Sequence, residues 1–283
     1  MLDSIGKPHD RSTLLSLIKS CQKDNDLMRV RRIHDDLCEQ SLISSDIYVA
    51  TALIMTYAKC GSLEEAQNVF YQLPTHDVVS WNALISGYAQ RGLGNEALKC
   101  FRQMQDMGVH PDGTTYVCIL KTCGIVGSLK VGEEIDAVLR NHGLLQEDVF
   151  IGTALVDMYC KCHALEKAQE LFEQIPMRNV VSWNALINGY TQHGLGDQAL
   201  QCFKKMQNAA VSPDAVTYVC VIKACGIIGC LEMGQDIYVE VRKRGLLEKD
   251  VVLGTALVDM YSKCGSLEKA HEVFELLPVQ SVI

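Results

Sequence analysis

The feature that most constrains the fold is a 35-residue stretch that occurs twice, 102 positions apart. Val78–Asp112 reads VVSWNALISGYAQRGLGNEALKCFRQMQDMGVHPD, and Val180–Asp214 matches it without a gap at 23 of the 35 positions. The neighbouring segments keep the same offset, with copies that start at Thr51, Thr153 and Thr255 and at Tyr116 and Tyr218. A fixed period of this kind is typical of units that bury their apolar faces against their neighbours. We therefore expect one elongated array rather than the two globular domains that the length alone suggests.

The 102-residue cycle divides into unequal blocks of 36, 31 and 35 residues. In chain order the blocks are Arg11–Asp46, Ile47–Asp77, Val78–Asp112, Gly113–Asp148, Val149–Asn179, Val180–Asp214, Ala215–Asp250 and Val251–Ser281. Residues 1–10 form an N-terminal tail, and Val282 and Ile283 are similar to the start of a further block. The sequence thus predicts a single array over residues 11–281.

Inside each block the apolar residues follow helical spacing. In Val78–Asp112 the first apolar set is Trp81, Leu84, Ile85 and Tyr88. After Gly92-Leu93-Gly94 comes a second apolar set, Ala97, Leu98, Phe101 and Met104. Each block is therefore expected to be a helix, a glycine-bearing turn and a second helix. The predicted fold is all-α, a right-handed α-solenoid of stacked helix-turn-helix repeats. The first helices carry little charge and are expected to face a ligand on the concave side.

Composition and charge restrict the function. The net charge of −8 argues against a uniformly basic nucleic-acid binder, so any such binding needs a local stripe of positive charge. No apolar run approaches the roughly 18 residues that span a bilayer, and we expect no membrane contact. The N-terminal residues MLDSIGKPHDRS lack the character of a signal or transit peptide.

Most of the 13 cysteines repeat in register, as Cys21, Cys123 and Cys225 do. We interpret them as small buried apolar residues of a reducing compartment rather than as disulfides or metal ligands. Cys160 and Cys162 have no second pair, and no zinc site or other cofactor is expected.

The motifs VVSWNALISGY, TYV and TALVDMY with their following glycines resemble the pentatricopeptide repeat proteins, and within them the plant-type subclass that alternates P, L and S repeats. The resemblance covers residues 11–281. In that scheme the P blocks are 78–112 and 180–214, the L blocks are 11–46, 113–148 and 215–250, and the S blocks are 47–77, 149–179 and 251–281. The resemblance implies binding of single-stranded RNA, one base per repeat. It also implies a place in the mitochondrion or chloroplast.

In the family, base choice depends on the fifth and the last residue of a repeat. Carried onto this chain, the pairs are Asn82 with Asp112, Asn184 with Asp214, Thr51 with Asp77, Thr153 with Asn179, and Thr255 with Ser281. An Asn amide beside an Asp favours uracil, whereas a Thr leaves room for a purine, guanine with Asp and adenine with Asn. The L blocks have aliphatic fifth residues, Leu15, Val117 and Val219, and are expected to read little. With the N-terminal end toward the RNA 5′ end, the expected target is N-G-Y-N-A-Y-N-R.

Two further sets follow from the resemblance. The second residue of each block corresponds to the family's base-stacking position, or else is a core residue at the helix start; these residues are Tyr48, Val79, Thr114, Phe150, Val181, Val216 and Val252. Lysines recur in register on the first helices and could neutralise the RNA backbone, or else are ordinary solvated lysines; they are Lys19, Lys59, Lys121, Lys161, Lys223 and Lys263.

Two other functional classes share features with this sequence. The mean unit of 34 residues equals that of tetratricopeptide repeats, so a peptide-binding scaffold is the alternative. Relatives of the alternating type carry deaminase-like domains that edit organellar RNA, but the chain lacks the His-x-Glu and Cys-x-x-Cys motifs of a zinc deaminase. We expect no catalysis by this chain, which would serve as the specificity factor for editing or other RNA processing. Its partners would be editing-complex proteins or a C-terminal deaminase domain absent from this sequence.

Overall fold

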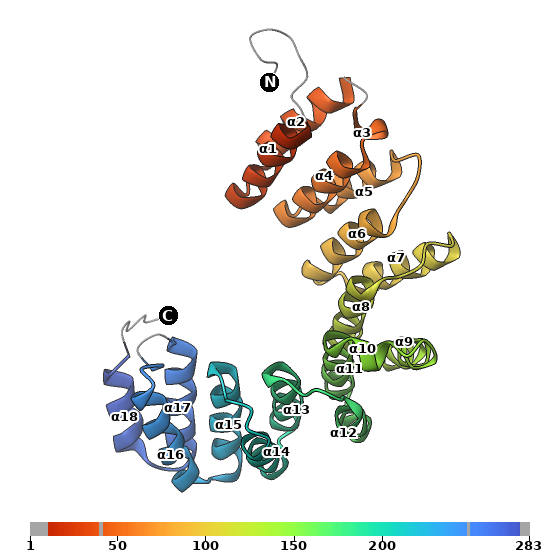
Figure 1. Cartoon of the computed structure of the whole chain (residues 1–283). Helices are drawn as coiled ribbons and strands as arrows, with labels where there is room; N and C mark the ends of the chain where they lie inside the picture. The colour runs from red at the N-terminus through yellow and green to blue at the C-terminus, as the bar shows by residue number, and fades with distance from the viewer. Residues whose placement is uncertain (1–10, 40–41, 248–249, 278–283) are drawn as a thin grey trace. The chain divides into compact units, whose positions relative to one another are not determined.

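The computed structural model describes residues 11–39, 42–247 and 250–277, and within these ranges it contains eighteen α-helices and no strand (Figure 1). The expected all-α repeat solenoid is confirmed, because paired helices recur along the described chain. The helices fall into two compact units, Met1–Val126 and Gly127–Ile283, and each is described by itself.

The first unit contains the helices of the first three blocks and the first helix of the fourth. Its elements are α1 (Arg11–Asp24), α2 (Leu27–Glu39), α3 (Leu42–Ser45), α4 (Ile47–Cys60), α5 (Leu63–Tyr71), α6 (Val78–Gln90), α7 (Gly94–Asp106) and α8 (Gly113–Val126). The first helices α1, α4, α6 and α8 pack against one another in chain order. The second helices α5 and α7 each pack on their own first helix and on that of the next block.

The second unit repeats this arrangement. Its elements are α9 (Leu129–Asn141), α10 (Leu144–Glu147), α11 (Val149–Lys161), α12 (Leu165–Gln174), α13 (Val180–Gln192), α14 (Gly196–Asn208), α15 (Ala215–Ile228), α16 (Leu231–Lys243), α17 (Val251–Lys263) and α18 (Leu267–Glu275). Helices α11, α13, α15 and α17 form a row of neighbours, and Figure 1 shows α13, α15 and α17 side by side. Each unit therefore presents a row of first helices.

The apolar sets predicted from helical spacing form the core. Trp81 of α6 and Met104 of α7 are 1% and 0% exposed. Neighbouring first helices approach closely through glycine. A Cβ atom on Gly87 would lie 2.5 Å from the Cβ of Ala58, and one on Gly189 would lie 2.3 Å from the Sγ of Cys160. These distances are shorter than any side chain tolerates, so the row of first helices requires glycine at these two contacts.

The cysteines behave mainly as core residues. Seven of them are buried, namely Cys21, Cys100, Cys123, Cys160, Cys202, Cys220 and Cys225. Burial raises the pKa of the Cys160 and Cys202 thiols to about 12, which keeps both protonated and unreactive at neutral pH.

Two elements were not expected from the sequence. The one-turn helices α3 and α10 lie between the second helix of an L block and the start of the next block. They occupy part of the additional length by which an L block exceeds an S block. No described helix is both long enough and apolar enough to cross a bilayer.

Candidate nucleic-acid interface

The fifth and last residues of each P block are directly hydrogen-bonded. Asn82, on the second turn of α6, donates from Nδ2 to Asp112 Oδ1 at 3.0 Å. Asn184, at the same place on α13, donates to Asp214 Oδ1 at 2.9 Å. Thirty residues separate the partners in sequence, and the hairpin fold brings them together in both units. The two pairs that the sequence singled out in the P blocks are therefore pairs in space.

A third residue completes each of these sites and was not predicted from the sequence. The hydroxyl of Thr115 lies 2.6 Å from Asn82 Oδ1 and 2.8 Å from Asp112 Oδ1. Thr217 makes the same contacts with Asn184 at 2.6 Å and Asp214 at 2.9 Å. The backbone N–H of each Thr also donates to the same carboxylate oxygen at 2.8 Å. The available signal was the Asp-x-x-Thr spacing of a capping box.

These bonds concentrate on one oxygen of each carboxylate. Oδ1 accepts from the Asn amide and from the Thr backbone N–H, and the single proton of the Thr hydroxyl is shared between this oxygen and the Asn oxygen. Oδ2 takes no part in this set. Burial disfavours the charge on Asp112 and Asp214, but the bonds from threonine and asparagine outweigh it, so the pKa of each carboxyl is lowered. Each P site thus holds an ionised acceptor beside an amide donor.

The S-block pairs are arranged differently. Thr51 is 6% exposed, and Thr153 is half-buried with a buried Oγ1 that finds no hydrogen-bond partner among the described residues. Thr255 is exposed and donates to Val251 O on its own helix at 2.8 Å. Asp77 and Asn179 are exposed, and within the described residues no hydrogen bond joins either to its Thr. Ser281 lies outside the described residues.

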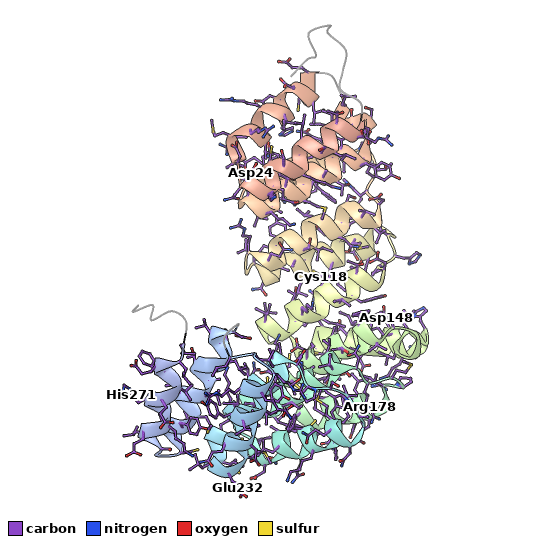
Figure 2. The ribbon with its side chains drawn as sticks, turned by 60° about the vertical axis from the view of Figure 1, so that its left-hand side comes forward. Asp24, Cys118, Asp148, Arg178, Glu232 and His271 are labelled. Carbon is purple, nitrogen blue, oxygen red and sulfur yellow. The ribbon has the colours of Figure 1, made fainter. Side chains whose placement is uncertain are left out.

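The last residue of a block has a structural role as well. Each one caps the first helix of the next block by accepting backbone N–H bonds, and the residues are Asp46, Asp77, Asp112, Asp148, Asn179, Asp214 and Asp250. Asp148, which is labelled in Figure 2, accepts from Phe150 N at 2.7 Å at the start of α11. An N-cap of this kind stabilises a helix by about 1 kcal/mol. Capping alone therefore accounts for an Asp or Asn at these positions, including the L blocks that have an aliphatic fifth residue.

The second residues of the blocks are exposed rather than in the core. Phe150 is 70% exposed, Tyr48 is 64% and Val79 is 54%. Thr114, Val181, Val216 and Val252 are exposed as well. The interpretation as helix-start core residues is wrong for this set. The apolar and aromatic side chains in this set are exposed to solvent and are available to pack on a ligand.

The lysines of the first helices fall into two groups. Lys161 pairs with Asp157 and Lys263 with Asp259, both at 2.7 Å and one turn apart on their own helices. The others are exposed and form no ion pair with another described residue; they are Lys19, Lys59, Lys121 and Lys223. Three of these four lie on L-block helices, where the fifth residues Leu15, Val117 and Val219 are half-buried. Positive charge is thus least compensated on the L helices.

The described residues contain no group of three or more His, Cys, Asp or Glu side chains that could hold a metal ion.

Family comparisons agree with this architecture. A model described as the PPR repeat family matches residues 76–124 and 178–226. A model described as the PPR repeat matches residues 48–78, 153–180, 216–246 and 255–280. Together the matches cover more than half of the chain. The chain belongs to the pentatricopeptide repeat family.

Similar curated pentatricopeptide repeat proteins come from Arabidopsis thaliana. A chloroplastic one is 35% identical over 272 residues, which are 96% of this chain and 43% of that protein. A putative mitochondrial one is 33% identical over 271 residues, again 96% of this chain and 43% of that protein. The chain therefore spans less than half the length of these relatives.

Solved pentatricopeptide repeat structures share the fold. The protein PPR10 in complex with an 18-nucleotide psaJ RNA element matches with a TM-score of 0.74 and 20% identity over 96% of this chain and 40% of that chain. PPR10 from maize matches with a TM-score of 0.67 and 20% identity over 94% of this chain and 39% of that chain. At this identity the likeness shows the fold.

Proposed function

We propose that this pentatricopeptide repeat chain binds single-stranded RNA and selects bases through the fifth and last residues of its P and S blocks. The observation that carries the proposal is the Asn–Asp hydrogen bond of the P blocks, which has the same geometry in both units. PPR10, which shares the fold, was solved with an RNA element bound. Membership of the family and this repeated polar pair together support RNA as the ligand.

The P-block pair presents the chemistry that uracil needs. The Watson–Crick edge of uracil carries an N3–H donor beside carbonyl acceptors, and cytosine carries a lone pair at N3 instead. An ionised Asp112 accepts from N3–H of uracil, and the second N–H of Asn82 donates to a carbonyl oxygen. Cytosine would place its N3 lone pair against the carboxylate. A two-point contact of this kind discriminates between bases by about 1–3 kcal/mol.

The other blocks supply the rest of the recognition. The S blocks, with Thr51 and Asp77, Thr153 and Asn179, and Thr255 and Ser281, are assigned to purines. The exposed second residues stack on base faces, as apolar and aromatic side chains do in single-strand binding proteins. The register lysines, Lys59, Lys121, Lys161, Lys223 and Lys263, neutralise phosphates. The predicted target in chain order remains N-G-Y-N-A-Y-N-R, with uracil as the preferred pyrimidine.

The biological setting is part of the proposal. We assign the chain to the alternating P, L and S subclass and to a mitochondrion or chloroplast, where its curated relatives are named as chloroplastic and mitochondrial. There it would serve as the specificity factor for RNA editing or another RNA-processing step, with catalysis supplied by other proteins or by a deaminase domain.

A gel shift tests this function. Labelled single-stranded RNA containing A-G-U-A-A-U-A-A is expected to shift at moderate salt, and exchanging the G at the second position with the A at the fifth is expected to weaken binding. Duplex DNA of the same sequence is the control and should not shift. Equal affinity for the exchanged RNA would reject the base assignment. Binding to neither RNA would favour a peptide-binding scaffold instead.

A further inference from the structure

The hydroxyls of Thr115 and Thr217 take part in helix capping, and each also contacts an Asn side chain, which capping does not explain. Both side chains are completely buried, at 0% exposed, and each contacts both members of a P-block pair. We propose that Thr115 and Thr217 are specificity-determining residues, whose hydroxyls hold the amides of Asn82 and Asn184 in the one orientation that presents an N–H to the base. This inference rests on the proposed function, since it concerns how the same sites choose uracil.

The hydrogen-bond geometry fixes the orientation of the amide. An Asn side chain has a donor end and an acceptor end of similar shape, and a rotation by half a turn exchanges them. At Asn82 the acceptor Oδ1 faces the Thr115 hydroxyl at 2.6 Å, while the donor Nδ2 faces Asp112 Oδ1 at 3.0 Å. Reversing the amide would place Oδ1 against the Asp112 carboxylate, so that two acceptors face each other, and would remove the hydrogen bond that the Thr115 hydroxyl donates to Oδ1. Both contacts therefore select the same orientation.

The orientation decides what remains for the ligand. With Oδ1 engaged by threonine and one Nδ2 proton engaged by aspartate, the second Nδ2 proton is the group that is left to bond with a base. This donor matches a carbonyl oxygen of uracil and does not match the N4 amino group of cytosine. Without the hydroxyl, Oδ1 loses its donor, and only the contact with Asp112 still favours the observed orientation of the amide. The site would then tolerate cytosine better.

The contact follows the identity of the fifth residue. Thr115 and Thr217 are the third residues of L blocks, each of which follows a P block. The P blocks follow S blocks and have Ser80 and Ser182 as their third residues. These serine hydroxyls donate to the backbone oxygens of Asp77 and Asn179 at 2.9 and 2.8 Å. Among the described residues, neither serine forms a hydrogen bond with Thr51 or Thr153.

The S blocks carry Val49, Ile151 and Leu253 at this position, which have no hydroxyl. Among the described residues, a hydroxyl at this position therefore bonds to the fifth residue of the preceding block where that residue is Asn.

The serines provide a matched control. Ser80 Oγ accepts from the backbone N–H of Asp77 at 3.1 Å, and Thr115 Oγ1 accepts from that of Asp112 at 3.2 Å. Ser80→Ala and Thr115→Val therefore both remove the reciprocal backbone bond of a helix cap, but only Thr115→Val removes a bond to the side chain of a fifth residue, Asn82. Loss of the cap should lower stability in both variants, whereas base choice at the third position should change only in Thr115→Val.

The experiment compares the dissociation constants of two labelled RNAs, A-G-U-A-A-U-A-A and A-G-C-A-A-U-A-A, for the unmodified chain and three variants. The unmodified chain, Ser80→Ala and Thr115→Ser should prefer U at the third position. Thr115→Val should lower that preference by roughly tenfold, the change expected for one hydrogen bond's contribution to orientation. A preference that survives in Thr115→Val, or one that falls equally in Ser80→Ala, would overturn the inference.

A second measurement separates failure of the inference from failure of the proposed function. The side-chain NH₂ pair of Asn82 is assigned in a two-dimensional ¹⁵N–¹H spectrum by its loss in Asn82→Ala, and it is followed without RNA. We expect this pair to shift in Thr115→Val and to stay in place in Ser80→Ala. An unmoved pair would overturn the hydroxyl contact itself. If the unmodified chain binds both RNAs equally, Asn82 does not read the base. The specificity role of Thr115 would then be overturned as well, even if the NH₂ signals of Asn82 shift in Thr115→Val.

Discussion

Removing a block-final carboxylate separates helix capping from base reading. Asp214 and Asp148 both cap first helices of the second unit, α15 and α11. Asp214 also accepts from Asn184, whereas the fifth residue of the block that ends at Asp148 is the aliphatic Val117. We therefore expect Asp214→Ala to lose two functions and Asp148→Ala to lose one.

The magnitudes follow from these contacts. Loss of an N-cap costs about 0.5–2 kcal/mol of folding free energy in either variant. Asp214→Ala also leaves Nδ2 of Asn184 without its acceptor in a residue that is only 8% exposed, which costs about 1–3 kcal/mol more. We expect a loss of about 2–4 kcal/mol for Asp214→Ala and about 1 kcal/mol for Asp148→Ala.

Urea unfolding followed by tryptophan fluorescence measures this difference. The chain has two tryptophans, so a Trp81→Phe background leaves Trp183, the neighbour of Asn184, as the reporter. Affinities for RNAs with U or C at the sixth position provide the second readout. Asp214→Ala should lose the preference for U, and Asp148→Ala should keep it. Equal losses of stability, or a loss of preference in Asp148→Ala, would refute the separation of the two roles.

Two other predictions concern charge. Lys161→Ala should weaken binding to all RNA sequences alike and reduce the slope of log affinity against log salt by about 0.7, the value for one single-strand phosphate contact; a change in base preference would contradict a backbone role. Because the pKa values of Asp112 and Asp214 are lowered in the folded chain, their stabilising charge is fully present above the unfolded-state pKa and is lost only as pH falls through the lowered value. The preference for U at the third and sixth positions should therefore persist as pH falls to the ordinary aspartate pKa and decline below it. Competition binding with U and C RNAs across this pH range measures the preference. Loss of the preference above the ordinary aspartate pKa would contradict the prediction.

The sequence predicted the helix hairpins because the period and the apolar spacing are both strong signals. The positions of Trp81 and Met104 in the core follow from spacing alone. The helices α3 and α10 were missed because each has four residues, which is too short to show helical periodicity. The division of the described chain into two units could not be predicted either, because the sequence repeat continues unchanged through the boundary between them.

The candidate sites were predicted in part. The Asn–Asp pairs of the P blocks were identified through the family resemblance, and the structure shows that their side chains meet. The role of Thr115 was missed because its contact with Asn82 joins residues 33 positions apart, on neighbouring first helices. Local spacing could identify Thr115 as part of a helix cap but could not show the second bond.

The S blocks show where a shared motif does not fix the environment. Thr51 and Thr255 stand in the same TAL motif, yet Thr51 is buried and Thr255 is exposed. Helix α6 packs against α4, which carries Thr51. Helix α17 is the last of the described first helices, so no following neighbour of that kind covers Thr255. Burial at the fifth position therefore depends on the next block, which the motif itself does not encode.

The central claim is that the fifth and last residues of a P block choose the base, and exchanging the fifth residue tests it most directly. Asn82→Thr keeps Asp112 and gives the block at 78–112 the Thr–Asp pair that is assigned to guanine at the second position. Binding is measured against four RNAs that differ only at the third nucleotide. We predict that the preferred base changes from U to G while preferences at the other positions stay the same. Retention of U, or an equal loss of affinity for all four RNAs, would contradict it.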